Sequence, residues 1–174
     1  MGIPIFETER LRLRPFLHQD AVPLHKILAV DGVLRYYPSS DPPDLERVER
    51  LVARQLEHWE EHGYGWWAVD DKANMELIGW SGLQYLPETD EIEIGYLLGR
   101  PFWSQGLATE GARVGMKFGF DKLVIPTIIG IVHPENIASQ RVLEKNGLKF
   151  LKETEYFGMQ CYKYESENPG IPDG

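Results

Sequence analysis

A stretch from Phe102 to Glu110, FWSQGLATE, has the residue types of a loop that wraps a diphosphate and then begins a helix. The alternating, largely apolar residues 91–98 before it predict a strand, and the proline-free residues 108–122 after it have helical spacing. Strand, glycine-bearing loop and helix N-terminus direct unpaired N–H groups and the positive end of the helix dipole at one point. The stretch therefore predicts an anion site, although a single glycine also occurs in ordinary strand-to-helix turns.

A second stretch, His58-Trp59-Glu60-Glu61-His62, fits the His-x-x-Glu-His pattern of metallopeptidases, with both histidines on one helical face. It falls at the expected end of a helix, beside Gly63, where histidine is common because it complements the helix dipole. The sequence offers no compelling third ligand, so we expect no metal and keep this pattern as a rival interpretation.

Composition limits the class of protein. The 174 residues suit one domain, expected over 1–166 with a flexible tail at 167–174, and 43% hydrophobic residues indicate a globular chain. The lone Cys161 fits a reducing cytoplasm and reads as a buried strand thiol. The sequence predicts neither a membrane span nor a secretory signal. A net charge of −9 argues against nucleic-acid binding and suits solubility or cationic partners such as amines.

The elements that must position the loop form a mixed sheet with helices on its faces. Asp20 and Asp44 are candidate helix caps, and Gly63 is a candidate helix terminator. We expect helices over 20–30, 45–62, 108–122 and 137–146, and strands over 11–15, 66–70, 76–85, 91–98, 128–132, 150–155 and 160–165. This order predicts an α+β fold with a mostly antiparallel sheet.

Glycines add two details. Gly111, Gly115 and Gly119 recur every four residues, so one stripe of their helix has almost no side-chain volume and can lie close on the sheet. Gly95 interrupts a strand of strong propensity, which suggests a bulge or a close backbone approach. A bulge would splay this fourth strand from the fifth, at 128–132, and open a ligand slot between their C-terminal ends.

With these elements in place, the chain resembles the GNAT acyl-CoA N-acyltransferases, and more narrowly the RimJ/RimL-type ribosomal-protein N-terminal acetyltransferases. Four segments in the right order, spanning roughly residues 8–164, carry the resemblance. They are Thr8 to Pro15; Tyr64 to Val69 with Leu77-Ile78-Gly79; Glu93 to Tyr96 with Phe102 to Glu110; and His133 to Ser139 with Val142 to Gly147.

The resemblance implies acetyl-CoA as co-substrate. Its diphosphate would lie on the loop and its pantetheine arm along the strand as a surrogate strand. The implied contacts are Leu97, Leu98, Trp103, Ser104, Gln105, Gly106, Leu107, Ala108, Thr109, Asn136 and Ser139. Two positions depart from the wider family: Trp103 stands where Gln or Arg is usual, which the branch tolerates, and Leu143 replaces a frequent tyrosine acid.

Amide formation needs a neutral amine, an aligned thioester and a place for thiolate charge. Glu93 is the preferred base because it lies on the strand lining the slot, and Glu91 on the same face is the reserve. Ser139 is the candidate donor to the thiolate. Asn136 is a candidate contact of the pantetheine arm, although an asparagine there also suits a helix N-cap.

The acceptor is left open between a protein N-terminal α-amine and a small-molecule amine, and the chain between monomer and homodimer. Tyr36, Tyr37 and Trp66 are candidates for an acceptor pocket or for the core, and His133 is a loop residue near the slot. The alternative function is a non-catalytic acyl-CoA-binding or sensing module on the same fold.

Overall fold

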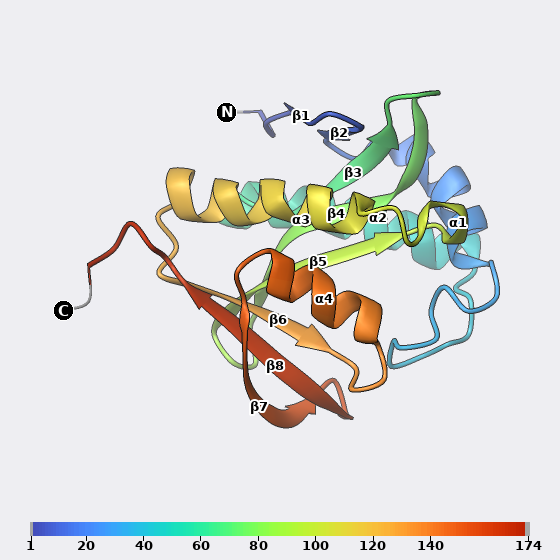
Figure 1. The fold of residues 1–174 in the computed structure, drawn as a ribbon. Coiled ribbons are helices and arrows are strands. Elements are labelled where there is room, and N and C mark those ends of the chain that lie inside the picture. Colours follow the sequence, from blue (N-terminus) through green and yellow to red (C-terminus); the bar gives the residue numbers. More distant parts are fainter. Residues whose placement is uncertain (1, 173–174) are drawn as a thin grey trace.

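The computed structural model describes residues 2–172, which form one eight-stranded sheet in the order β1-β2-β3-β4-β5-β6-β8-β7 (Figure 1). Neighbouring strands are antiparallel except for the pair β5 and β6. The strands are β1 Phe6–Glu7, β2 Leu11–Arg14, β3 Trp66–Asp71, β4 Glu76–Leu86, β5 Glu91–Leu98, β6 Thr127–Val132, β7 Lys149–Tyr156 and β8 Met159–Glu167.

Four α-helices cover the two faces of this sheet: α1 Ala21–Leu28, α2 Leu45–His62, α3 Leu107–Lys117 and α4 Ile137–Lys145. The helices α1 and α2 pack with Trp80 and Leu97 in one apolar cluster, whereas α3 packs with Leu83 and Ile94 in the other. The helix α4 contacts α3 and β6, so it lies on the face of α3 (Figure 1). The expected α+β fold with a mostly antiparallel sheet is confirmed.

The parallel pair is short. β5 pairs with β4 from Glu91 to Leu98, but it pairs with β6 only where Glu93 faces Ile129. β6 in turn pairs with β8 along its whole length. Since both strands continue past this single position, they diverge toward their C-terminal ends, which confirms the expected splay between the fourth and fifth predicted strands.

The predicted bulge at Gly95 is wrong. The β4–β5 register runs unbroken through Gly82 and Gly95, and the register shifts lie in the β3–β4 and β7–β8 pairs instead. A Cβ on Gly95 would lie 3.1 Å from Nε1 of Trp66. The glycine therefore admits a close approach by the indole, and the splay arises without a bulge.

The glycine stripe of α3 does bring that helix onto the sheet. A Cβ on Gly115 would lie 2.7 Å from Cδ1 of Ile94, and one on Gly119 would lie 2.8 Å from Cδ1 of Ile128. The α-helix is shorter than expected, because residues Phe118–Lys122 continue it as a π-helical turn.

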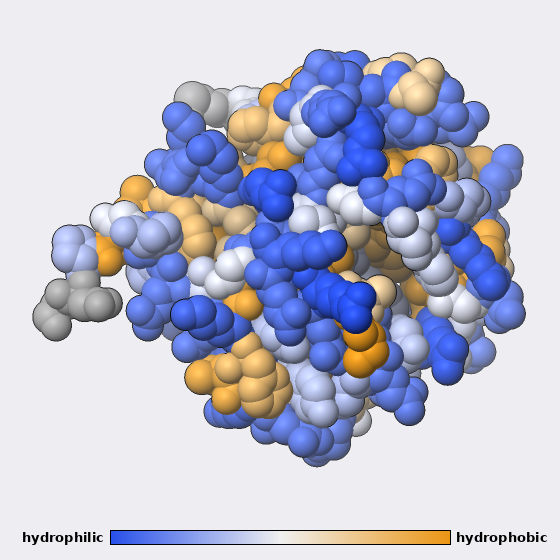
Figure 2. Space-filling view, viewed as in Figure 1, coloured by the Kyte–Doolittle hydropathy of each residue, from blue (hydrophilic) through white to orange (hydrophobic). Residues whose placement is uncertain are grey.

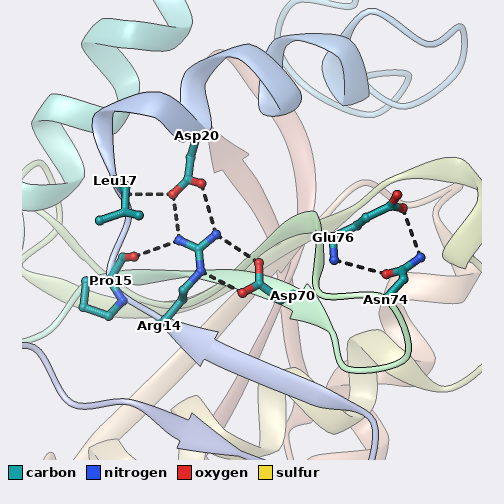
Figure 3. Close-up of polar contacts among 7 residues, drawn as sticks. All are labelled: Arg14, Pro15, Leu17, Asp20, Asp70, Asn74 and Glu76. Atoms are coloured by element: carbon teal, nitrogen blue, oxygen red, sulfur yellow. Dashed lines mark hydrogen bonds and ion pairs between the residues drawn. The ribbon is translucent and has the colours of Figure 1, made fainter.

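The first helix begins differently from the prediction. Asp20 makes no side-chain cap to α1; its carboxylate accepts from the N–H of Leu17 at 2.7 Å and pairs with Arg14 at 2.8 Å. Arg14 also pairs with Asp70 of β3 at 2.7 Å (Figure 3). The hydrogen bond to Asp20 and then that to Asp70 raise the pKa of the Arg14 guanidinium despite its burial. This cluster joins β2, β3 and the start of α1.

The chain beyond 166 is packed for longer than expected. β8 runs to Glu167, and the buried Asn168 donates to the carbonyls of Phe120 and Ile125, both at 3.1 Å. The packed part of the domain therefore extends through Asn168, past the boundary expected at residue 166. Flexibility of the remaining tail stays a prediction, and Met1, Asp173 and Gly174 lie outside the described residues. Among residues 2–172, every helix is too short or too polar to cross a membrane.

Candidate active site

The loop before α3 has the geometry of an anion site. Gly106 precedes the helix in the left-handed region, at φ 78°, and Ser104 is also left-handed, at φ 60°. The consecutive main-chain N–H groups from Ser104 to Thr109 donate to no acceptor within residues 2–172, whereas Glu110 N–H already bonds to the carbonyl of Gly106. Several unpaired donors thus converge at the positive end of the α3 dipole.

Trp103 fixes the loop to the end of β5. Its indole N–H donates to the carbonyl of Leu98 at 2.8 Å, and the side-chain amide of Gln105 donates to the carbonyl of Pro101 at 2.9 Å. The side chains of Leu97, Leu98 and Leu107 are buried, so these residues can meet a ligand only through their main chain. The carbonyl of Leu98 is already engaged by the indole.

Sequence reasoning missed a clamp that holds the loop from outside. Arg10, in the β1–β2 turn, donates from Nη1 to the carbonyl of Gln105 at 2.8 Å and pairs with Glu110 at 2.7 Å. Thr8 donates to the same carboxylate at 2.6 Å. Burial raises the pKa of Glu110, but the hydrogen bonds from Thr8 and Arg10 outweigh it, so the pKa is lowered and the clamp stays charged.

Open space adjoins this loop on two sides. Grooves of about 540 and 500 Å³ flank the clamp where β1 and β2 approach α3. On the other side, Figure 2 shows a hollow to the right of centre, beside the N-terminal end of α4. In Figure 1, β5 ends near that hollow, and Trp103 bonds the loop before α3 to the same end of the strand. The anion site and the divergence of β5 from β6 therefore meet in one place.

Glu93 lies where the two strands begin to diverge. Its side chain is half-buried, and burial raises the pKa of the carboxyl to about 8; the main-chain N–H of Ile131 opposes this rise and the charge of Glu91 adds to it. The carboxyl can therefore exchange a proton near neutral pH, as a general base must.

Glu91, the reserve base, is otherwise engaged. Its carboxylate accepts from the hydroxyl of Tyr156 at 2.5 Å and pairs with the ammonium of Lys163. Burial raises the pKa of Glu91, but Lys163 and Tyr156 outweigh it and the pKa is lowered. The structure thus separates two carboxylates that share a strand face: Glu91 is paired and ionised, and Glu93 has no cationic partner within residues 2–172.

The first turn of α4 carries the other predicted residues. Oδ1 of Asn136 accepts the N–H of Ser139 at 3.2 Å, so Asn136 is an N-cap. The hydroxyl of Ser139 lies 2.8 Å from that of Tyr96, a residue of β5 that sequence reasoning did not single out. Leu143 is buried, and Gly130 of β6 is the glycine that admits it: a Cβ there would lie 2.5 Å from Cδ2 of Leu143.

Two tyrosines from the α1–α2 connection reach the slot. The ring of Tyr36 lies 5.1 Å from that of His133, and the hydroxyl of Tyr37 lies 3.5 Å from the carbonyl of Tyr96. Trp66 stacks on Trp80 at 4.9 Å in the apolar cluster of α1 and α2, and its buried indole N–H has no partner among residues 2–172. Its Nε1 would lie 3.1 Å from a Cβ on Gly95, so Trp66 also lies against β5, two residues from Glu93.

In the histidine pattern at the end of α2, His58 makes its contacts with other residues of the protein. Nδ1 of His58 lies 2.7 Å from the carbonyl of Tyr64, and Nε2 accepts the N–H of Tyr85 at 3.1 Å. Both ring nitrogens are thus engaged, and burial lowers the pKa of His58. Among residues 2–172, no three His, Cys, Asp or Glu side chains cluster as metal ligands. These contacts assign His58 to the packing of α2. Cys161, predicted to be a buried strand thiol, is buried in β8.

Comparison with known proteins agrees with this geometry. The profile described as an acetyltransferase (GNAT) domain matches residues 10–149. The uncharacterized N-acetyltransferase YoaA of Bacillus subtilis (strain 168) is 30% identical over 167 residues, covering 95% of this chain and 92% of its own. FsC-acetyl coenzyme A-N(2)-transacetylase of Aspergillus fumigatus is 32% identical over 120 residues, covering 64% of this chain and 48% of its own.

Solved structures share the fold. An acetyltransferase from Agrobacterium tumefaciens str. C58 superposes with a TM-score of 0.84 at 27% identity, covering 96% of each chain. RimL, a ribosomal L7/L12 α-N-protein acetyltransferase solved with coenzyme A, superposes with a TM-score of 0.80 at 18% identity, covering 94% of this chain and 98% of its own. The family profile spans well over half of the sequence, and the chain belongs to the GNAT family of N-acetyltransferases.

Proposed function

We propose that this protein transfers an acetyl group from acetyl-CoA to a primary amine by direct attack within a ternary complex. One observation carries the proposal: the unpaired N–H groups of Ser104–Thr109 and the titratable Glu93 lie at the two ends of the gap that opens between β5 and β6. A diphosphate at the first end and an acylated thiol near the second match a molecule of coenzyme A.

The cofactor would be held mainly by main-chain groups. The amides of the loop bind the diphosphate, with Trp103 and Gln105 fixing the loop and the N-terminus of α3 adding its dipole. The pantetheine arm lies between β5, at Leu97 and Leu98, and the start of α4, at Asn136. Because Leu98 already shares its carbonyl with Trp103, the arm depends on the other main-chain groups of this edge.

Glu93 would accept the proton that the amine loses. An α-amine has a solution pKa near 8, as the Glu93 carboxyl has here, so the proton moves between groups of similar affinity. Ser139 would donate a hydrogen bond to the departing thiolate. Alignment of amine and thioester supplies most of the acceleration.

The acceptor would be a protein N-terminal α-amine or a small-molecule amine, in the manner of the RimJ/RimL branch. RimL, named for acetylating a ribosomal protein, supports the first, and the FsC transacetylase supports the second. The acidic sequence favours a cationic acceptor over nucleic acid. We further propose that the protein works in the cytoplasm as a monomer or homodimer.

Thiol release from acetyl-CoA across a panel of amines and peptides tests the proposal. Turnover with at least one primary amine is the expected result, and mass spectrometry of that product should show one added acetyl group. Tight binding of CoA without turnover on any amine would instead favour a non-catalytic acyl-CoA-sensing module. Failure to bind CoA would remove both functions.

A further inference from the structure

The strand β5 presents different chemistry on its two faces. Side chains alternate along a strand, so Glu93 and Leu97 point to one face, and Ile94 and Tyr96 point to the other. The packing agrees with this alternation. Leu97 belongs to the apolar cluster of α1 and α2, whereas Ile94 belongs to the apolar cluster of α3, and Tyr96 packs against that cluster of α3. Tyr96 therefore lies on the face opposite Glu93, within three residues of it.

On that face the side chain of Tyr96 reaches α4. Its hydroxyl lies 2.8 Å from the hydroxyl of Ser139 and 3.1 Å from the carbonyl of the same residue. This contact joins β5 to the first turn of α4, and the ring of Tyr96 also packs against the apolar cluster of α3. Burial raises the pKa of Tyr96, so its hydroxyl stays protonated throughout the physiological range and can donate.

We propose that Tyr96 is a positioning residue that holds the hydroxyl of Ser139 toward the leaving sulfur. The proposal rests on the proposed acetyl transfer. The one hydrogen of Tyr96 has two acceptors in reach, the carbonyl of Ser139 at 3.1 Å and its Oγ at 2.8 Å, and in the second contact either oxygen can be the donor. The proposed arrangement is the one in which Tyr96 donates to Oγ, because the hydrogen of Ser139 is then free to point into the gap. Without Tyr96, the Ser139 hydroxyl can turn instead toward a main-chain carbonyl of its own helix, as serine does in a helix.

The reaction step balances without any group beyond amine, thioester and water. The amine nitrogen forms a bond to the thioester carbon and passes a proton to Glu93, which releases it to water. The carbon–sulfur bond then breaks, and the sulfur leaves with its electron pair, hydrogen-bonded to Ser139. The thiolate finally takes a proton from water, so neither Ser139 nor Tyr96 changes its protonation state.

The two faces of β5 suit the two ends of this reaction. The attacking nitrogen and the departing sulfur occupy different positions around the tetrahedral carbon, so a base on one face and a donor on the other serve both at once. This placement also accounts for Leu143: a buried leucine there leaves the donor role to hydroxyls closer to the start of α4.

The test is a double-mutant cycle with Tyr96→Phe and Ser139→Ala, read as kcat and as the Kd of CoA. Each single variant should lower kcat roughly 10- to 100-fold, at the low end of acid–base effects, while the Kd of CoA changes less than about twofold. The double variant should be no slower than the slower single variant, because all three variants lose the same oriented hydrogen bond from Ser139 to the leaving sulfur. Tyr164→Phe is the matched control, since Tyr164 also bonds to α4, through Gln140 at 3.4 Å, and should keep wild-type kcat.

The outcomes separate this inference from the proposed function. Wild-type turnover with an unaffected Tyr96→Phe variant, or fully multiplicative losses in the double variant, would overturn the role of Tyr96 and leave acetyl transfer standing. Absence of wild-type turnover on every amine would overturn both. Thermal unfolding checks each variant, and Ser139→Ala, which leaves the sheet untouched, still decides the case if Tyr96→Phe unfolds: wild-type kcat in Ser139→Ala would overturn the inference by itself.

Discussion

Buried polar groups are treated in opposite ways in two regions of this protein. In the cluster of Arg14, Asp20 and Asp70, every charge has a partner, and the guanidinium bonds to both carboxylates (Figure 3). In the gap between β5 and β6, the half-buried Glu93 has no cationic partner within residues 2–172, and the nearby loop leaves its N–H groups undonated. Satisfied groups hold a fold together, whereas unsatisfied ones are free to bind and react.

The same contrast separates two carboxylates on one strand. Glu91 and Glu93 share a face of β5, yet Lys163 and Tyr156 bond only to the carboxylate of Glu91. The charge of Glu91 then helps to keep Glu93 protonated. A paired carboxylate thus tunes an unpaired one two residues away, and substitutions in each region should produce losses of different kinds.

The largest expected effect is on turnover in Glu93→Gln. Removing the base should lower kcat about 10²- to 10⁴-fold with CoA affinity retained. In the wild type, the base must be ionised, so kcat/KM should rise with pH and level off above a pKa of about 8. Initial rates of thiol release between pH 6 and 9.5 measure both. Glu60→Gln, on the exposed side of α2, is the control, and a Glu93→Gln enzyme with the wild-type rate and profile would reject the base.

The same substitution should leave the fold intact or stabilise it. The pKa of Glu93 is raised in the folded state, so the folded protein binds more protons than the unfolded chain between the two pKa values, and stability falls as pH rises through that window. Glu93→Gln should therefore gain melting temperature relative to wild type at pH 9 but not at pH 4.5. A loss at pH 9 would show that Glu93 is structural.

Arg14→Met should lower stability and leave turnover nearly unchanged, which is the reverse of what we expect for Glu93→Gln. It leaves two buried carboxylates without their cation, which costs about 3–5 kcal/mol of unfolding free energy. Chemical denaturation measures this loss, and kcat of the folded enzyme should change little because the cluster lies away from the gap. Arg50→Gln is the control: Arg50 pairs with Glu46 on the surface, with the two side chains 53% and 76% exposed, and should cost less than about 1 kcal/mol. A comparable cost for both variants would erase the distinction between the regions.

Local rules predicted most elements of this fold. α2 runs from Leu45 to His62 with Asp44 as its cap and Gly63 as its terminator, as the spacing of apolar residues, caps and glycine indicates. The strand β1 was missed because a strand of two residues is too short to show an alternating pattern of apolar and polar side chains. The cap predicted at Asp20 failed because the N–H of Leu17 and the guanidinium of Arg14, six residues away, already occupy the same carboxylate.

In the candidate site, too, sequence predicts the features that depend on short spacing and misses those that depend on contacts between distant residues. The loop, Glu93 and the cap at Asn136 follow from residue types at short spacing. Tyr96 and the Arg10 clamp do not, because their partners, Ser139 and Glu110, lie 43 and 100 residues away in the sequence. Sequence ranks Glu93 ahead of Glu91, but it does not show the ion pair that separates them, because Lys163 of β8 supplies that pair.

Arg10→Gln tests a contact that belongs to both regions. The clamp satisfies Glu110 and also holds the carbonyl of Gln105, so its loss should loosen the anion loop and raise the Kd of CoA about tenfold, or about 1.4 kcal/mol. The cost in unfolding free energy should be smaller than for Arg14→Met because the Arg10 side chain is 44% exposed. Isothermal titration with CoA measures the first effect. Lys117→Gln removes an equal charge from the C-terminal end of α3, where Lys117 pairs with Asp121 and not with the clamp. An equal change in Kd would mean that net charge, not the clamp, is responsible.

The smallest effect concerns His58, whose two ring nitrogens are both satisfied. Protonation would place a second N–H against the N–H of Tyr85, and burial already lowers the pKa of His58. Below about pH 6.5 the unfolded chain therefore binds a proton that the folded protein resists, so wild-type stability falls as pH drops. His58→Gln should cost about 1 kcal/mol at pH 7.5, measured by urea denaturation, and this difference should shrink at pH 5.5 because the variant has no such proton to gain. His18→Gln, at an exposed position, should show no change in either respect. If the difference in unfolding free energy between wild type and His58→Gln stays constant from pH 7.5 to 5.5, the folded protein can protonate the ring in place. The hydrogen bonds of His58 at the end of α2 would then not restrain its protonation.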